Sequence, residues 1–313
     1  MSVRNLRHRL EYLLFRLIVC VIDALSPRVT ARAAESLAFI VHYCLPRRWS
    51  RFPVARENLQ RAFGDQLSER EIDRTVYRMW VHLFRMVAEM VQSTRKVHLH
   101  SYRDIIAFES HRPTVEAMCS GRRVLLLSGH FGNWEAGITI FGLWDFPMGV
   151  IAREMDNPYL HDWFARYRES TGHRLLLKKG DFDEMLTLLQ RGGHVGLLGD
   201  QDAGSRGLFV DFFGVPASTF KSIALLAIEY DALIVVGSTM RETDDFAAAP
   251  WVRFSMHCDG VFDPREYPGS DAVREMTQDY TRALETAIRR APEQYFWVHR
   301  RWKSEPRVRR KAA

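Results

Sequence analysis

A histidine and a glutamate lie close together in a glycine-rich stretch of the sequence. The stretch is LLLSGHFGNWEAG, residues 125–137, in which four residues separate His130 from Glu135. A carboxylate that hydrogen-bonds one ring nitrogen of a histidine fixes the tautomer and makes the other nitrogen more basic, as a general base requires. The pair is therefore a candidate for proton abstraction. The simpler alternative is a loop histidine followed by an acid that is favourable at a helix N-terminus.

The residues around this pair predict where it lies in the fold. The apolar run 124–127 is expected to be a buried strand that ends at Ser128 and Gly129, and open α/β sheets bind ligands at the carboxyl ends of strands. Five positions apart on one continuous helix, the two side chains would point about 140° away from each other. We therefore expect His130 in the loop and Glu135 in the first helical turn, with the carboxylate folded back onto the ring. The sequence has no G-x-S-x-G nucleophile motif, which argues against a Ser-His-Asp hydrolase.

A second polar cluster follows another apolar run. Asp200, Gln201 and Asp202 come directly after the run at 194–198 and have glycines on both sides. Two carboxylates one residue apart can bind a divalent metal, as in some nucleotide-sugar enzymes, or can order a loop through turn hydrogen bonds. The aromatic residues that follow, Phe209, Phe212 and Phe213, suit either an acyl-chain pocket or the core.

Composition limits the class of protein. The 313 residues are 47% hydrophobic and 26% charged, which is typical of a globular chain and argues against a polytopic membrane protein. The net charge of +6 favours acidic partners or anionic membrane surfaces. The four cysteines are scattered, and no Cys/His cluster has the spacing of a metal site.

The N-terminal residues predict contact with a membrane surface. The segment 9–25 is largely apolar, but Glu11, Arg16 and Asp23 interrupt it, which argues against a signal peptide and against a simple spanning helix. An amphipathic helix that lies on a membrane, or packs on the body of the protein, fits better. The next apolar stretch, 34–49, ends in Pro-Arg-Arg-Trp, which is typical of a membrane interface.

The order of elements predicts an α/β fold with a helical N-terminal portion. Residues 1–95 show helical periodicity, whereas β-rich runs and helical segments alternate after residue 120. We expect a central mixed sheet flanked by helices over residues 96–313, integrated with the N-terminal portion into one domain. Strands are expected in the β-rich runs, which begin at residues 122, 146, 173, 194, 208, 232 and 251.

Five blocks of sequence together resemble one family of enzymes. They are ARENLQRAFGD (55–65), LLLSGHFGNWE, IAREMDNPYLHDWFARYRESTG (151–172), LLGDQDAGSRGLFVDFFGVPASTF and PEQYFWVHRRWKSEP (292–306). In this order they are similar to the lipid A biosynthesis lauroyl/myristoyl acyltransferases, which are related to the phosphatidylinositol mannoside acyltransferases. One departure is the N-terminal anchor, which is more continuously apolar in the usual members.

The resemblance implies acyl transfer from a thioester to a hydroxyl of a membrane glycolipid. The donor would be acyl carrier protein, or less often acyl-CoA. His130 would take the proton of the acceptor hydroxyl, and Glu135 would orient and polarise His130. Neither a metal nor an organic cofactor is implied, and no nucleic acid is expected as a partner.

The same blocks supply candidate substrate-binding residues. Arg153 would bind a phosphate of donor or acceptor, with a surface ion pair as the alternative, and Asp200 and Asp202 would shape the site. The remaining candidates are Asn133, Asn157, Gln201, Lys221, Arg300 and Arg301.

The resemblance places the protein at the cytoplasmic face of the inner membrane, as a peripheral or monotopic protein. The basic excess would attract the acidic carrier protein. The amphipathic N-terminus and the basic tail 300–313, which contains seven Lys and Arg residues, would contact the lipid. Three other functions remain open, namely a metal-dependent glycosyltransferase built on Asp200 and Asp202, an enzyme that acylates a phosphatidylinositol mannoside, and a scaffold with an inactive acyltransferase fold.

Overall fold

The computed structural model describes residues 3–178, 180–247, 249 and 251–306. Its N-terminal part contains the α-helices α1 (Val3–Ala24), α2 (Pro27–Phe39), α3 (Phe52–Phe63) and α4 (Glu69–Lys96). A π-helical turn (Ile40–Cys44) continues α2, and a 3-10 turn (Gly64–Gln66) follows α3. Ser26 caps α2 by accepting a hydrogen bond from the Val29 N–H, and Ser68 begins α4 with a reciprocal capping box to Glu71. Among the described residues, no helix is long and apolar enough to cross a membrane.

The rest of the chain forms a seven-stranded mixed sheet covered by helices on both faces. The strand order is β1-β9-β8-β2-β5-β3-β4, and every pair is parallel except β8 with β9. The strands of this sheet are β1 (Ile106–Phe108), β2 (Val124–Ser128), β3 (Met148–Ala152), β4 (Arg174–Leu177), β5 (His194–Leu198), β8 (Leu233–Arg241) and β9 (Phe254–Phe262). The predicted fold class is therefore confirmed.

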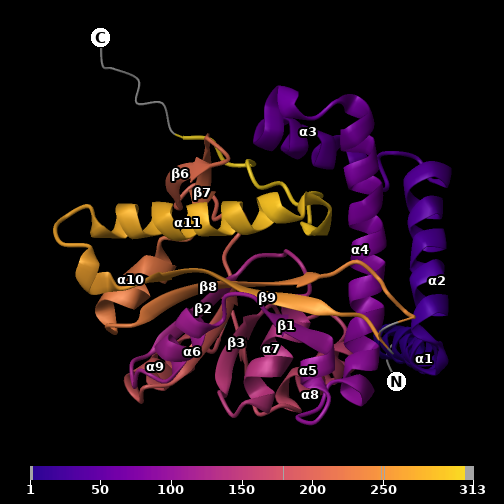
Figure 1. Ribbon diagram of the computed structural model, residues 1–313, viewed down its shortest axis with the longest axis horizontal. Coiled ribbons are helices and arrows are strands. Elements are labelled where there is room, and N and C mark those ends of the chain that lie inside the picture. Colours follow the sequence, from indigo (N-terminus) through magenta and orange to yellow (C-terminus); the bar gives the residue numbers. More distant parts are fainter. Residues whose placement is uncertain (1–2, 179, 248, 250, 307–313) are drawn as a thin grey trace.

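Helices on the two faces enclose separate hydrophobic clusters. The helices α9, α10 and α11 bury one face through Leu125 and Leu127 of β2, whereas α6 and α7 bury the other through Val124. Figure 1 shows α11 across the top of the sheet and α7 below it. The helices of this region are α5 (Tyr102–Ile105), α6 (Arg112–Met118), α7 (Trp134–Leu143), α8 (Pro158–Glu169), α9 (Phe182–Gln190), α10 (Ser222–Glu229) and α11 (Ala272–Arg290).

Two strands lie outside the main sheet. All seven β-rich runs form strands, but β6 (Leu208–Phe212) pairs only with β7 (Val215–Thr219) in a separate antiparallel hairpin. Phe212 and Phe213 of this region pack against Trp297 and Trp302 in a cluster that also contains Leu59 of α3. These two phenylalanines are therefore core residues and do not line an acyl-chain pocket.

Candidate active site

The loop between β2 and α7 carries His130, and neighbouring segments fix its backbone. The Phe296 N–H donates to the His130 carbonyl at 3.0 Å, and the Gly132 N–H donates to the Gln294 carbonyl at 3.0 Å. Gly132 has a φ of +60°, and a Cβ there would lie 2.1 Å from the carbonyl oxygen of Thr239 on β8. Only glycine fits this position, because the left-handed backbone and the close approach both exclude a side chain. The sequence block that contains His130 and the C-terminal block, residues 292–306, thus meet at the candidate base.

Asp200 holds the imidazole of His130. Its Oδ1 lies 2.8 Å from Nδ1 of the ring, and its Oδ2 accepts the backbone N–H of His130 at 2.9 Å. Asp200 directly follows β5, which pairs with β2 in parallel, so the two residues emerge side by side at the carboxyl edge of the sheet. The carboxylate is almost completely buried, whereas 23% of the histidine side chain is exposed.

This contact leaves Nε2 as the open position of the ring. Since Asp200 accepts from Nδ1–H, Nε2 carries the lone pair and can receive a proton. Its described neighbour is Nε2 of Gln201 at 3.3 Å, which can donate to it. Burial lowers the pKa of His130, but the charge and hydrogen bond of Asp200, together with the charge of Glu135, raise the pKa by more, so the net shift is upward. For Asp200 the two effects have opposite signs from those on His130. Burial raises the pKa of the carboxyl, but the charge and hydrogen bonds of His130 outweigh burial and lower the pKa to about 2.

Glu135 has different partners from those expected. It lies in the first turn of α7 and His130 lies in the preceding loop, as predicted. However, its carboxylate accepts hydrogen bonds from Arg168 of α8 at 2.6 and 3.1 Å, and from the Trp134 indole at 3.2 Å. The expectation that Glu135 hydrogen-bonds the ring is therefore wrong. A buried carboxylate requires a charge partner, and α8 supplies the guanidinium, while β5 brings Asp200 to the ring.

A buried network on the far side of the loop fixes the start of α7. Asn133 caps α7 by accepting the Ala136 N–H at 3.0 Å, and its amide donates to Glu89 of α4 at 3.0 Å. Glu89 also pairs with Arg241 of β8, and His82 of α4 lies 2.9 Å from the same arginine. Burial and the Arg241 charge lower the pKa of His82 well below its ordinary value, so the neutral ring donates to the Gly132 carbonyl at 3.0 Å. The predicted substrate-binding residue Asn133 thus serves the loop itself.

Three further candidates also make contacts within the protein. The Asn157 amide donates to the His8 carbonyl and to Glu11, both at 2.9 Å, which joins α8 to α1. Asp202 accepts from the Gly204 N–H at 3.1 Å and from Ser304. Arg301 is 2% exposed and donates to Thr219 Oγ1 at 2.7 Å.

Asp200 and Asp202 have separate roles in these contacts. The described residues contain no group of three or more His, Cys, Asp or Glu side chains that could hold a metal ion. Asp200 uses both oxygens on His130, and Asp202 joins its own loop to the C-terminal segment. Through these hydrogen bonds, Asp200 orders the His130 loop and Asp202 orders its own loop.

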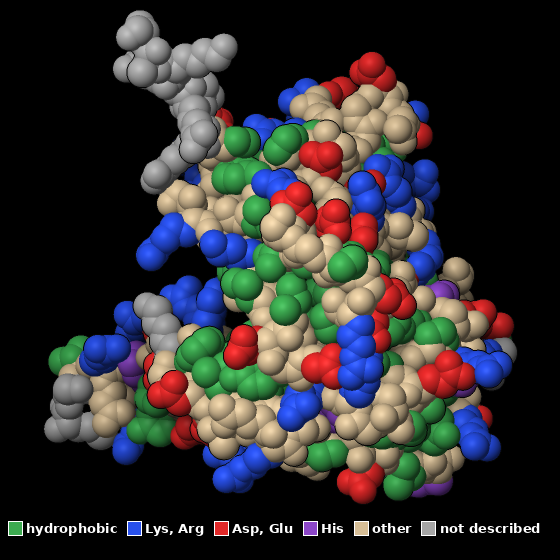
Figure 2. Space-filling model, turned by 90° about the vertical axis from the view of Figure 1, so that its left-hand side faces the viewer, with side chains coloured by type: hydrophobic (Ala, Val, Ile, Leu, Met, Phe, Trp, Pro, Cys, Tyr) green, Lys and Arg blue, Asp and Glu red, His purple; other side chains and the backbone are tan. Residues whose placement is uncertain are grey.

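The exposed basic candidates lie at the surface. Arg153 follows β3, Lys221 precedes α10, and Arg300 lies in the C-terminal segment; all three side chains are exposed. In the described part of the chain, none of the three has a side-chain hydrogen bond or ion pair, so the surface ion pair considered as the alternative for Arg153 is not seen. Figure 2 shows Lys and Arg side chains on both sides of a hollow in one face of the molecule. The rest of the basic tail, residues 307–313, lies outside the described residues.

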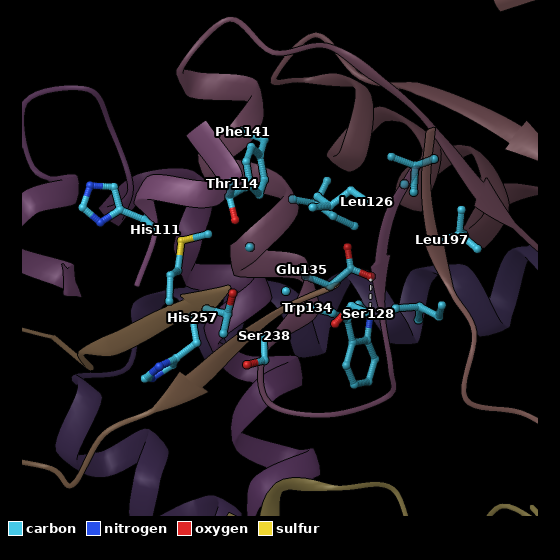
Figure 3. Close-up of a pocket in the computed structure, with 18 of the residues that line it drawn as sticks. His111, Thr114, Leu126, Ser128, Trp134, Glu135, Phe141, Leu197, Ser238 and His257 are labelled. Atoms are coloured by element: carbon cyan, nitrogen blue, oxygen red, sulfur yellow. Dashed lines mark hydrogen bonds between the residues drawn. The ribbon is translucent and has the colours of Figure 1, made fainter. Parts of the chain in front are cut away.

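An apolar pocket, here called the sheet pocket, lies between the sheet and helices α6 and α7. Its cavity volume is about 90 Å³, and it opens to solvent at one side. At one end are Ser128, Trp134, Glu135 and Arg168, and Figure 3 shows the Glu135 carboxylate above the Trp134 indole. Trp134 also contacts the His130 ring edge-on, with ring centroids 5.2 Å apart. One indole therefore separates the candidate base from an apolar space.

Comparison with known proteins assigns the chain to a family. The sequence profile of the bacterial lipid A biosynthesis acyltransferases matches residues 2–304. The chain belongs to this family. The acyltransferase is 25% identical to the lipid A biosynthesis lauroyltransferase of Escherichia coli over 82% of this chain and 80% of that protein. It is 27% identical to the palmitoleoyltransferase of the same organism over 61% of this chain and 59% of that protein.

A shorter match links the chain to a second group of acyltransferases. A phosphatidylinositol mannoside acyltransferase of Mycolicibacterium smegmatis is 30% identical over 38% of this acyltransferase and 40% of that protein. Family membership, as predicted from the five blocks, is confirmed. It also favours acyl transfer over glycosyl transfer for the site at His130.

Several residues around the site of this acyltransferase were not predicted from the sequence. Arg168, Trp134 and Arg241 carry no motif of their own, although Arg168 and Trp134 lie inside the blocks quoted above. Glu89 did leave a signal, because it lies beside Met86 and Met90 on the buried side of α4. A charged residue at a buried helical position needs a partner and thereby indicates a network.

Proposed function

We propose that this acyltransferase moves a fatty acyl chain from the thioester of acyl carrier protein to a hydroxyl of a membrane glycolipid, most simply a lipid A precursor. His130 is the general base and Asp200 is its orienting carboxylate. The observation that carries the proposal is the 2.8 Å contact between Asp200 and Nδ1, which leaves the basic lone pair on Nε2, beside the Gln201 amide.

The chemistry requires one base and no covalent enzyme intermediate. Nε2 of His130 takes the proton of the acceptor hydroxyl as its oxygen attacks the thioester carbonyl. When the tetrahedral intermediate collapses, the carbon–sulfur bond breaks, and the imidazolium returns the proton to the leaving thiolate. Asp200 stabilises the imidazolium and keeps the ring in the productive tautomer, as the carboxylate does in a Ser-His-Asp triad.

In this scheme Glu135 holds the side chains at one end of the sheet pocket in place. Its ion pair with Arg168 and its hydrogen bond to Trp134 fix the side chains that lie between His130 and the apolar space. The sheet pocket is the natural place for the acyl chain, because it is lined mainly by apolar side chains and reaches Trp134. Glu135 is thus a positioning residue.

The charge and the exposed apolar surface of the protein support acyl carrier protein and a membrane as its partners. Acyl carrier protein is acidic, so exposed Arg153, Lys221 and Arg300 suit it as the donor. The outer face of α1 exposes a row of large apolar side chains, of which Leu13 and Leu17 are each 62% exposed, and Trp49 beyond α2 is 64% exposed. Such a face favours binding in the interfacial region of a bilayer, and we assign it to the cytoplasmic surface of the inner membrane.

Reconstitution in lipid vesicles tests this function. Purified protein is mixed with acyl carrier protein thioesters or acyl-CoA and with a lipid A precursor or a phosphatidylinositol mannoside, and product mass is measured. We expect an acyl increment on the lipid A precursor, its persistence in EDTA, and its loss in His130→Ala with unchanged thermal unfolding. Activity that needs a metal and survives His130→Ala would instead favour glycosyl transfer. A wild-type protein inactive with every donor would support the scaffold hypothesis.

A further inference from the structure

Two glycines lie in the centre of the sheet, directly under the sheet pocket. Gly196 of β5 pairs with Leu126 of β2, and Gly237 of β8 follows Val236, whose partner is Leu127 of β2. Both glycines line the sheet pocket, one on each side of the strand that leads to His130. The strands themselves are buried in the middle of the sheet, where large apolar residues are usual.

The backbone does not require glycine at either position. Neither residue has a φ in the left-handed region. A Cβ on Gly196 would lie 3.9 Å from its nearest neighbours, Met148 and Val150, and a Cβ on Gly237 would lie 3.5 Å from the His257 carbonyl, which are ordinary contacts. Gly132 differs, because its Cβ would lie 2.1 Å from a carbonyl. The register of β8 against β9 shifts between Val236 and Gly237, so a β-bulge is one reason for glycine at position 237, whereas Gly196 lies in regular pairing. A glycine inside a strand still costs about 0.5–1 kcal/mol relative to alanine, and the φ of Gly237 is open to other residues.

The shape of the sheet pocket supplies the reason. Its lining residues come from six adjacent strands, from Phe108 on β1 to Ile151 on β3. Five strand spacings of roughly 4.8 Å place the outer strands about 24 Å apart. A space that crosses strands in this way fits an extended, unbranched alkyl chain better than a compact ligand.

The longer arm of the sheet pocket starts at Gly237. From β2 toward β1 the lining includes Phe108 of β1 and Met256 of β9, together with Phe141 of α7 and Trp144 at its end, whereas only β5 and β3 lie on the other side. Figure 3 shows Thr114 and Phe141 around this arm and Leu197 on the opposite side. A chain whose carbonyl lies near His130 must cross β8 to enter the longer arm, and among the lining residues of β8, which are Gly237, Ser238 and Thr239, only Gly237 has no side chain.

We propose that Gly237 determines the acyl-chain length that this enzyme accepts, and that Gly196 widens the same space beside β2. This inference rests on the proposed acyl transfer. A side chain at position 237 stands in the path of the distal methylenes and leaves the reacting carbonyl untouched. Gly237 is thus a specificity-determining residue, and its substitution separates long donors from short ones.

The test compares donors from hexanoyl to hexadecanoyl in the wild type and in Gly237→Val. We expect kcat/KM for the longest donors to fall by about tenfold or more relative to the shortest, since one methylene in an apolar pocket changes kcat/KM by about tenfold or more. Short donors keep the wild-type rate, and the midpoint of thermal unfolding stays equal or rises. Gly237→Ala, which adds one carbon, gives a smaller shift in the same direction and serves if the valine variant does not fold.

The control is Val236→Ala on the same strand. Val236 is fully buried and belongs to the cluster on the opposite face, so its loss lowers stability without entering the sheet pocket. Its chain-length preference should equal that of the wild type. An unchanged preference in both Gly237 variants, with an active wild type, overturns this inference alone. A wild type that transfers no acyl chain overturns the proposed function instead.

Discussion

The Asp200 carboxylate binds His130 twice, through the ring Nδ1 at 2.8 Å and through the backbone N–H at 2.9 Å. One residue at the end of β5 therefore fixes both the side chain and the loop that carries it. Glu135, which completes the His-x4-Glu motif, instead binds Arg168. Under the proposed function, His130 of this motif acts on the substrate and Glu135 orders the side chains around it.

Replacement of Asp200 should lower turnover more than replacement of Glu135. We expect Asp200→Asn to reduce kcat by about 10²–10⁴-fold with little change in KM, because the amide no longer fixes the tautomer or stabilises the imidazolium. Glu135→Gln should mainly raise KM for long donors, since it loosens Arg168 and Trp134. Steady-state kinetics on both variants decides, and near-normal kcat in Asp200→Asn would remove Asp200 from the mechanism.

The pH dependence should follow the pKa of His130. A general base works in its neutral form, so kcat/KM should rise with pH and level off above a pKa that lies higher than that of an ordinary histidine. In Asp200→Asn the charge that raises this pKa is gone while burial still lowers it, so the acid limb should move to lower pH. An NMR titration of the ring gives the same comparison without turnover. A limb that stays in place would show that another group controls the rate.

Gly132 should tolerate no side chain. We expect Gly132→Ala to lower the free energy of unfolding by more than about 2 kcal/mol, because a left-handed residue is strained and its Cβ would overlap the Thr239 carbonyl. The matched control is Gly214→Ala in the turn between β6 and β7, where φ is +72° and nothing lies within 4 Å. Denaturant unfolding measures both. Equal losses would mean that backbone strain alone, and not the contact with β8, makes glycine necessary.

The buried pair of Glu89 and Arg241 should be important for stability. Each side chain is 6% exposed, so Glu89→Gln leaves an arginine buried without its charge partner, which costs about 3–5 kcal/mol. The control, Glu116→Gln, removes an ion pair with Arg112 at the surface and should hardly change unfolding. Thermal unfolding compares them. Similar midpoints for both variants would contradict the role given to the network.

The apolar face of α1 should control binding to vesicles. We expect the double substitution Leu13→Glu and Leu17→Glu to weaken sedimentation with anionic vesicles about tenfold or more, because each leucine loses its burial in the bilayer. Leu225→Glu on α10, 45% exposed in the wild type, is the control and should bind like the wild type. Equal binding of all three proteins would move the membrane contact away from α1.

The sequence predicted helices and strands better than it predicted which side chains contact each other. Periodicity predicted the helical N-terminal portion and the β-rich runs, because burial repeats along a strand or helix. Spacing also located His130 in the loop before Glu135. It could not show that Asp200, seventy positions away, would reach the ring, since that contact depends on which strand pairs with β2. Arg301 shows the same limit, because adjacent Arg300 is exposed while Arg301 is buried against the β6–β7 hairpin.

Helix α4 connects the surface helices α1 and α2 to the loop that carries His130. Within four positions of each other, Glu89 holds Asn133 at the start of α7, and Gln92 donates to the Ile22 and Leu25 carbonyls at the turn between α1 and α2. In a truncated enzyme that begins after α2, Gln92 would lose these acceptors. The side of α4 that packs against α1 and α2 would then be exposed one turn from Glu89. Shortening the chain to gain solubility would therefore loosen the histidine itself, so detergents or nanodiscs are the better route to a working preparation.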